Sequence, residues 1–292
     1  MYDVTIVGGS YSGMAAALQL LRARRLVLVI DAGQRRNRNA PASHGFLTQD
    51  GVDPAEIART ARAQLTAYPT LTWLDAAATQ AESSEDGFSV TTSDGVWHQG
   101  QRLIFATGVS DTLPEIPGLA ERWGRSVFHC PYCHGYELGM GRIGVIATGP
   151  DSPHQALLLR EWGEVTLFLN GAFKPDEEGS AKLAERGVFV EASKIVQLEN
   201  HADVYLEDGR SLNFAGLFTV SRTTPSTPLV RNLGCELEPT PIGTQVKTDE
   251  GKQTSVAGVF ACGDTAYAPH SLTFAVSDGA LAGLHVHRSL VF

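Results

Sequence analysis

The sequence predicts an α/β fold built from two Rossmann-like nucleotide-binding domains of the three-layer ββα type. Two observations predict it. A strand, a glycine-rich turn, a helix and a second strand follow one another at the N-terminus, and the same order of elements returns from residue 142 onward. Between the two copies, residues 129–134 read HCPYCH, and this CxxC run indicates redox or metal chemistry.

The N-terminal copy has the layout of a dinucleotide-binding unit. Apolar strands are predicted over residues 4–7 and 26–30, and a helix rich in alanine and leucine is predicted over residues 14–21. Residues 8–13 form the glycine-rich turn between the first strand and the helix. The second strand ends at Asp31, at about the spacing of 20 residues that the dinucleotide fingerprint requires.

Four residues of this copy are candidate ligands of a nucleotide. Gly8 allows the tight turn, and Gly13 lets the helix lie close to the strand. Ser10 replaces the middle glycine of the fingerprint, and its small side chain still permits a close approach. We expect the helix N-terminus to face a pyrophosphate, and Asp31 to accept hydrogen bonds from a ribose.

The second copy departs from the fingerprint. Ala147 stands where the first glycine belongs, and Pro150 and Pro153 crowd the loop that would approach a phosphate. The strand predicted over residues 165–169 is followed by neither an acid for a ribose nor arginines for a 2′-phosphate. We therefore expect a scaffold that no longer binds a nicotinamide nucleotide.

Two further strands end in short polar turns. Residues 103–108 read as a strand that runs into Thr107 and a glycine, followed by a proline-rich crossover between domains. Near the C-terminus, an apolar strand over residues 259–262 ends at Gly263-Asp264, and a helix is predicted over residues 273–288. Asp264 suits an acid that meets a ribityl chain, and the alternative is a plain turn.

The CxxC has two interpretations. Cys130 and Cys133 can form a redox disulfide, or they can bind zinc with additional ligands. The spacing favours a redox pair, because Cys235 and Cys262 have no CxxC partner and adjacent histidines in a tight turn converge poorly on one ion. His134 is a candidate base, with a turn residue bonded to the backbone as the alternative. No metal is expected.

Composition excludes several classes of protein. The 292 residues are 43% hydrophobic and 19% charged, which supports real cores and argues against disorder. A net charge of −9 gives no basic field for nucleic acid or anionic lipid. No apolar run reaches the roughly 18 to 20 residues of a membrane span, and the N-terminus has no signal-peptide pattern. We expect a soluble, cytoplasmic protein without nucleic-acid or membrane partners.

Taken together, these motifs resemble the low-molecular-weight thioredoxin reductase family of flavoproteins. The resemblance rests on the 8–13 turn, the Ala-Thr-Gly turn at 106–108, the CxxC, the second nucleotide fold and the Gly-Val-Phe-Ala-Cys-Gly-Asp run at 258–264. It implies an FAD domain built from residues 1–115 and 235–292. It also implies an inserted domain over residues 116–234 that carries the CxxC, and a homodimer.

The chain departs from the typical reductases in three features. In these features it resembles a side branch of the family, the dithiol oxidases of disulfide natural products such as gliotoxin, holomycin and romidepsin. His134 stands where the reductases keep an acid, the second glycine loop is damaged, and the 2′-phosphate arginines are missing. This resemblance implies that a substrate thiolate attacks Cys130 and that Cys133 passes electrons to the flavin. Dioxygen would accept them and become hydrogen peroxide. The substrate would be a small-molecule dithiol or a protein thiol.

The resemblance also implies a set of FAD contacts in the N-terminal and C-terminal parts of the chain. These are Gly8, Ser10, Gly13, Asp31, Arg36, Asn37, His44 and Asp264, followed by Thr107, Ser271, Leu272 and Thr273. Arg36 and Arg38 could equally lie in a solvated loop, and the roles of His129 and His270 stay open. The alternatives to an oxidase are a disulfide reductase dependent on NAD(P)H or ferredoxin, and a flavin redox sensor that does not turn over.

Overall fold

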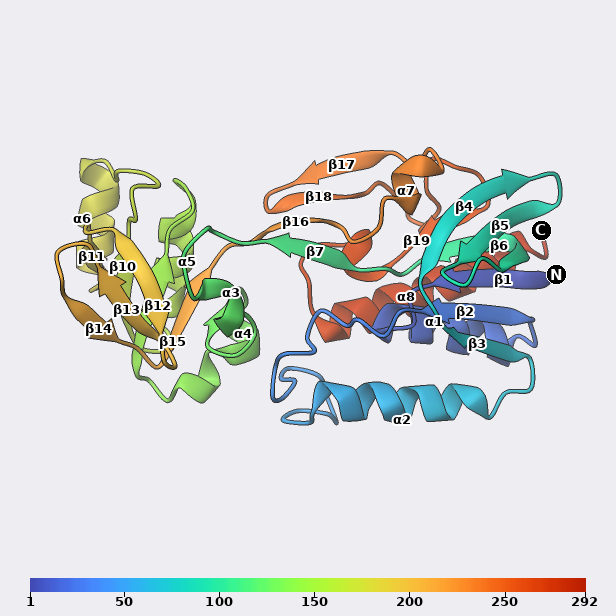
Figure 1. Ribbon diagram of the computed structural model, residues 1–292, viewed down its shortest axis with the longest axis horizontal. Coiled ribbons are helices and arrows are strands. Elements are labelled where there is room, and N and C mark those ends of the chain that lie inside the picture. Colours follow the sequence, from blue (N-terminus) through green and yellow to red (C-terminus); the bar gives the residue numbers. More distant parts are fainter. The chain divides into compact units, whose positions relative to one another are not determined.

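The computed structural model describes residues 1–292, which divide into two compact units (Figure 1). The first unit comprises Met1–Arg38, Phe46–Asp111 and Thr223–Phe292, and the second comprises Asn39–Gly45 and Thr112–Arg222. These limits differ in three places from the domains expected from the sequence. Residues 39–45 and 112–115 lie with the second unit, and residues 223–234 lie with the first.

The first unit is built on a seven-stranded sheet. Its strands lie in the order β3-β2-β1-β6-β5-β4, and β19 pairs with the carboxyl half of β6. The contacts among β1, β2, β3, β6 and β19 are parallel, whereas β4, β5 and β6 form an antiparallel meander. The strands are β1 (Tyr2–Val7), β2 (Val27–Asp31), β3 (Leu71–Asp75), β4 (Ala78–Ser84), β5 (Gly87–Thr92), β6 (Trp97–Phe105) and β19 (Val259–Ala261).

Helices and a small sheet complete the first unit. The helices are α1 (Tyr11–Arg22), α2 (Pro54–Thr66), α7 (Leu229–Asn232), the 3₁₀ turn η2 (Gly263–Thr265) and α8 (Leu272–Ser289). The small sheet has the order β17-β18-β16-β7, with β7 (Val109–Thr112), β16 (Arg222–Pro225), β17 (Leu237–Thr240) and β18 (Gly243–Val246).

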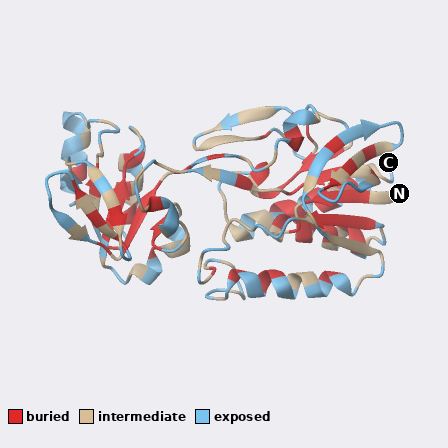
Figure 2. Cartoon of the chain, in the orientation of Figure 1, coloured by how far each residue is buried: buried red, intermediate tan, exposed pale blue.

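Side chains along the parallel strands point alternately to the two faces of the sheet, so the first unit has a hydrophobic core on each face. Ile6, Val29 and Ile104 point to the face covered by α1, α2 and α8, while Leu28 and Phe105 point to the opposite face. All five side chains are fully buried, as the red strands of Figure 2 show. A parallel sheet covered on both faces reads as a continuous apolar run, which is why its strands could be recognised in the sequence.

The second unit contains a five-stranded parallel sheet in the order β11-β10-β9-β15-β8. An antiparallel sheet of β12, β13 and β14 accompanies it. The strands are β8 (Val127–Phe128), β9 (Arg142–Ile146), β10 (Glu164–Phe168), β11 (Phe189–Glu191), β12 (Ile195–Glu199), β13 (Asp203–Leu206), β14 (Ser211–Asn213) and β15 (Gly216–Thr219). The helices are α3 (Leu119–Arg122), α4 (Pro131–His134), η1 (Tyr136–Leu138), α5 (Ser152–Leu159) and α6 (Glu177–Glu185).

The register of the first sheet brings distant residues to one edge. Val7 pairs with Ile30 on one side and with Phe105 on the other, and Phe105 also pairs with Ala261. The turns that follow β1, β2, β6 and β19 therefore leave the same edge of the sheet. In open α/β sheets this carboxyl edge is where ligands bind. None of the helices is long and apolar enough to span a bilayer.

Helices α1 and α8 pack in direct backbone contact. Gly279 and Gly283 of α8 face Ser12 and Ala16 of α1, and a Cβ atom at Gly279 would overlap the Ser12 carbonyl oxygen. Replacing Gly279 with alanine therefore forces the two helices apart.

We expect Gly279→Ala to lower the free energy of unfolding by about 1–3 kcal/mol, the usual range for overpacking a close contact. Thermal unfolding measured by circular dichroism checks this. Ser277→Ala is the matched control, because Ser277 lies on the exposed face of the same helix. Unchanged unfolding of Gly279→Ala relative to this control would contradict the close packing.

Candidate active site

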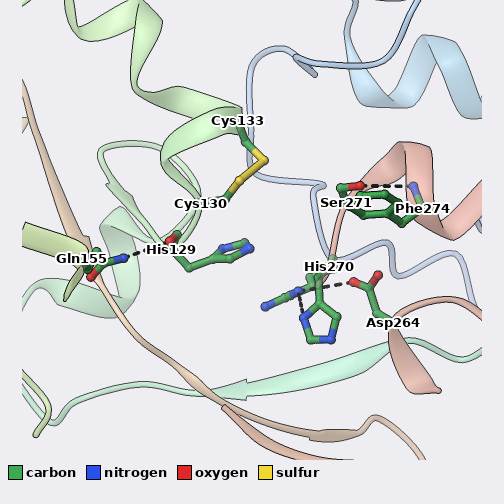
Figure 3. The surroundings of a disulfide bond; sticks show 9 residues. His129, Cys130, Cys133, Gln155, Asp264, His270, Ser271 and Phe274 are labelled. Atoms are coloured by element: carbon green, nitrogen blue, oxygen red, sulfur yellow. Dashed lines mark hydrogen bonds and ion pairs between the residues drawn. A yellow bond between two sulfur atoms is a disulfide. The ribbon is translucent and has the colours of Figure 1, made fainter. Parts of the chain in front are cut away.

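Cys130 and Cys133 form a disulfide in the second unit (Figure 3). Cys130 is the extended residue before helix α4, and Pro131 begins the helix, where a missing N–H does no harm. The Cys133 N–H donates to the Cys130 carbonyl at 3.3 Å. A Cβ atom at Gly135 would lie 2.8 Å from the Trp162 ring, so the turn carrying the disulfide is packed tightly on its inner side. Both cysteines are half-buried, which leaves them reachable by a thiol.

His134 lies against an aromatic surface. Its imidazole stacks on the Phe128 ring, with ring centroids 4.2 Å apart and an interplanar angle of 19°. Burial, with a smaller contribution from His44, lowers the pKa of His134 from 6.5 to about 4. An efficient base for a thiol needs a pKa near neutrality, and the pKa of His134 departs from that because the stacked ring has little access to water. His134 is therefore uncharged at neutral pH.

Two other histidines named in the sequence analysis, His44 and His129, also belong to the second unit. The His129 carbonyl accepts a hydrogen bond from Gln155 Nε2 at 3.0 Å (Figure 3). The centroid of the His129 ring lies 5.8 Å from that of the Trp123 ring. His44 Nδ1 lies 3.4 Å from Glu137 Oε1. The expected FAD contact at His44 stays a prediction, and the observed neighbours of His44 are on the CxxC side of the fold.

The glycine loop of the first unit has the geometry of a phosphate cradle. Gly8 has a φ of +103°, and a Cβ atom there would overlap the Ala106 carbonyl oxygen. A Cβ atom at Gly13 would overlap the carbonyl oxygen of Gly8. Ser10 precedes α1 in an extended conformation and makes no side-chain capping bond, so the first N–H groups of α1 are left for a ligand.

Asp31 lies beside this loop, as expected. Its Oδ1 accepts a hydrogen bond from the Gly9 N–H at 3.1 Å, which leaves Oδ2 for a ribose hydroxyl. A Cβ atom at Gly9 would lie 2.6 Å from the Trp73 indole, so Trp73 is a further neighbour of the nucleotide loop. Trp73 could not be found from the sequence, because the register that places β3 next to β2 is not visible in a local pattern.

The residues after β2 supply buried polar atoms without partners. Asn37 Nδ2 donates to the Tyr11 hydroxyl at 3.2 Å, while Asn37 Oδ1 is buried and makes no hydrogen bond. The Nε of Arg35 is likewise buried and unpaired. Orphaned buried groups call for a ligand or water. Together with the glycine cradle and Asp31, they show that the residues present fit a dinucleotide such as FAD.

Arg36 and Asp264 lie together in the first unit. Arg36 Nη1 is 3.3 Å from Asp264 Oδ2 and 2.9 Å from His270 Nδ1, and these contacts appear beside the labelled Asp264 and His270 in Figure 3. Asp111 holds the other side of the guanidinium, with bonds of 2.8 Å to Nε and 2.6 Å to Nη2. The solvated-loop alternative for Arg36 is therefore wrong, because its side chain is only 19% exposed.

The remaining expected contacts lie at the same carboxyl edge. Thr107 Oγ1 is 3.5 Å from Thr265 Oγ1 in the turn that carries Asp264. Ser271 caps α8, and its hydroxyl accepts a hydrogen bond from the Phe274 N–H at 3.1 Å (Figure 3). Leu272 and Thr273 are the first two residues of α8. Their contacts with FAD stay predictions.

A buried ion pair below the Asp264 turn escaped the sequence analysis. Lys252 Nζ lies 2.7 Å from Asp278 Oδ1, and Asp278 Oδ2 accepts the Gly263 N–H at 2.8 Å. Both side chains are more than 90% buried. One signal was available, since Asp278 is an acid within an otherwise apolar helix. Lys252 lies in a polar turn that carries no such signal.

In the second nucleotide loop, a side chain occupies backbone N–H donors of the loop itself. Ser152 Oγ accepts hydrogen bonds from the N–H groups of Thr148, at 2.9 Å, and of Gly149, at 3.3 Å. These are the backbone donors that a phosphate would need. Asn170, which follows β10, accepts the Ile195 N–H at 2.9 Å and therefore serves the local chain. The expected loss of nicotinamide binding has a physical basis here and stays a prediction.

The chain is similar to known disulfide oxidoreductases in sequence and in structure. The family described as Pyridine nucleotide-disulphide oxidoreductase matches residues 2–279. Thioredoxin reductase aclD of Aspergillus oryzae is 33% identical over 315 residues, covering 100% of this chain and 97% of that protein. The structure of an oxidoreductase from Agrobacterium tumefaciens is 52% identical with a TM-score of 0.97, covering 100% of this chain and 99% of the other. The structure of HlmI is 34% identical with a TM-score of 0.91, covering 99% and 92%. These likenesses confirm the predicted thioredoxin reductase-like fold.

The pKa of His134 makes stability depend on pH. The unfolded chain binds a proton at His134 near pH 6.5, whereas the folded chain binds it only near pH 4. Above pH 6.5 His134 is neutral in both states and does not lower the free energy of unfolding. As the pH drops from 6.5 to about 4, its titration lowers the free energy of unfolding by about 3 kcal/mol in all.

We expect His134→Phe, which keeps a ring on Phe128, to remove this loss. Urea unfolding of both proteins between pH 7.5 and pH 4, taken as the difference between them, cancels the titrations that they share. The wild type should lose stability relative to the variant across that window. Parallel pH profiles would show that His134 titrates normally.

Proposed function

Since the chain belongs to the pyridine nucleotide-disulphide oxidoreductase family and is a disulfide oxidoreductase, we propose that it is an FAD-dependent dithiol oxidase. The observation that carries the proposal is the contrast between its two nucleotide loops. The first is an open cradle with Asp31 beside it, while the second spends two of its backbone N–H donors on Ser152. A redox disulfide beside one open nucleotide loop and one self-bonded loop suits a chain that draws its electrons from thiols.

The thiol chemistry proceeds by two exchange steps. A substrate thiolate attacks Cys130 Sγ, the Cys130–Cys133 bond breaks, and a mixed disulfide forms while Cys133 leaves as a thiolate. The second substrate thiol, after losing its proton, attacks the substrate sulfur of the mixed disulfide. The substrate leaves as a disulfide, and both protein cysteines are reduced. FAD, when bound, supplies a two-electron acceptor for this dithiol, and dioxygen is the final acceptor that becomes hydrogen peroxide.

His134 has a limited part in these steps. A thiol of pKa about 8.5 would lose its proton to an imidazole of pKa about 4 at a cost of about 6 kcal/mol. The neutral ring can accept a hydrogen bond from a thiol or hold its proton briefly, but it cannot keep a large fraction of the thiol ionised. We infer that His134 contributes at the low end of the range for a general base, and that its contribution is largest where little of the substrate is already thiolate.

A second candidate is an NAD(P)H-dependent disulfide reductase, and the names of the relatives favour it. Thioredoxin reductase aclD and thioredoxin reductase sirT of Leptosphaeria maculans match 100% and 98% of this chain. In that case electrons would flow in the opposite direction, from nicotinamide to the disulfide.

An anaerobic titration separates the two functions. We expect purified protein to be yellow with bound FAD, and a small dithiol such as dithiothreitol to bleach the flavin. NADPH and NADH at micromolar concentrations should leave it oxidised, because the Ser152 hydroxyl already occupies the backbone N–H groups of Thr148 and Gly149 in the second loop. Admitting air after the dithiol should restore the flavin and yield hydrogen peroxide. Rapid bleaching by NADPH would instead establish the reductase, and a colourless protein that cannot take up FAD would overturn both.

Substitutions in the CxxC region should reduce dithiol turnover to different extents. Cys130→Ser and Cys133→Ser should each abolish dithiol turnover while retaining FAD, since neither can form the disulfide. His134→Ala should slow turnover by about 10²-fold, near the lower end of the usual effect of a general base, because its pKa is poorly matched to a thiol. The deficit should shrink as the pH approaches the pKa of the substrate thiol. Near-normal rates for His134→Ala at neutral pH would make the residue structural.

A further inference from the structure

Four half-buried side chains form a polar cluster in the first unit. Asp111 follows β6 by six residues, Asp264 lies in the turn after β19, and His270 precedes the Ser271 cap of α8. Arg36 joins all three, with every one of its guanidinium nitrogens bonded. The side chain of Asp111 is 9% exposed and that of Asp264 is 20% exposed.

The geometry fixes the tautomer of His270. A guanidinium has donors only, so the contact of 2.9 Å between Arg36 Nη1 and His270 Nδ1 requires Nδ1 to accept. The imidazole is then neutral, and its remaining hydrogen is on Nε2. His270 therefore has a single N–H donor, on Nε2, and the ring also hydrogen-bonds the Asp264 backbone.

The same bonds decide what Arg36 can do. The two-point pairing with Asp111 uses Nε and one hydrogen of Nη2, and Nη1 is used by Asp264 and His270. A guanidinium neutralised in this way is a poor partner for a pyrophosphate. It is well placed to hold a carboxylate and an imidazole in fixed orientations.

We propose that Arg36, anchored by Asp111, is a positioning residue of the flavin site that orients Asp264 as an acceptor and His270 as an Nε2–H donor. This inference rests on the proposed FAD site, and it replaces the direct FAD contact expected of Arg36. Asp264 and His270 would be the groups that touch the flavin, while Arg36 and Asp111 act through them.

The electrostatics of the cluster agree with this assignment. Burial lowers the pKa of His270, the Asp264 carboxylate opposes that shift, and the positive charge of Arg36 adds to it. Asp111 is the other charged group that acts on the ring, and it also opposes the shift. Removing the positive charge of Arg36 should therefore raise the pKa of His270, whereas removing the charge of Asp111 should not.

The test measures FAD affinity and the state of His270 in the full chain. Arg36→Gln, Asp111→Asn and the matched control Arg38→Gln are stripped of flavin and titrated with FAD. Arg38 is exposed and donates only to the Arg35 carbonyl. The ring nitrogens of His270 are followed by ¹⁵N NMR, with His270→Gln used to assign its signals.

We expect Asp111→Asn to weaken FAD binding about tenfold, and Arg38→Gln to leave it within about twofold. A direct phosphate contact predicts the opposite for Asp111→Asn, because freeing Arg36 from a carboxylate would preserve or strengthen binding, and that result would overturn the proposal. In the wild type at neutral pH, His270 should show the Nε2–H tautomer, and in Arg36→Gln it should titrate at higher pH.

The NMR measurement decides the question even if a variant fails to fold. A His270 that carries its proton on Nδ1, or that is protonated at neutral pH in the wild type, is incompatible with the proposed arrangement. Failure of the wild type to bind any FAD would overturn the proposed function, and it would be distinguishable from this outcome because the tautomer is read without flavin.

Discussion

The buried ion pair between Lys252 and Asp278 is the interaction on which the flavin side of the structure depends. Asp278 bonds the Gly263 N–H as well as Lys252, so it fixes the turn that presents Asp264. It also directly precedes Gly279, where α8 meets the backbone of α1. Removing one partner of such a pair strands a buried charge and typically costs about 3–5 kcal/mol. One helix position thus links the packing of the unit to the placement of the residues proposed to bind flavin.

The two units show how one topology can serve different chemistry. Each has a parallel sheet with a loop leading from a central strand into a helix. In the first unit, glycines bring the loop against neighbouring backbone, and the first N–H groups of α1 are left without a capping side chain. In the second, the Ser152 hydroxyl takes the same kind of donors. The difference lies in a few side chains, because the strand register that positions the loops is set by apolar residues present in both units.

Local patterns in the sequence predicted the strands, the glycine loop, Asp31 and the CxxC, since each depends on neighbours within one βαβ unit or one turn. The partners of Arg36 could not be predicted in this way. Its carboxylates are 75 and 228 residues away, and only the assembled sheet brings them together. The pKa of His134 was misjudged for a related reason, because the Phe128 ring that buries it comes from a separate strand. Residues 39–45 likewise follow β2 in sequence but pack with the second unit.

An uncharged His134 also bears on the direction of electron flow. Disulfides become strong oxidants when a nearby cation or helix end stabilises the thiolate of their reduced form. At neutral pH the imidazole next to Cys133 has no charge with which to do this, because its pKa is about 4. If the ring stays uncharged after reduction, the reduced pair gains little stability from its histidine and passes its electrons on more readily. A disulfide of that kind suits an enzyme that reoxidises its cysteines through a bound acceptor in every cycle, which is the behaviour proposed for this chain.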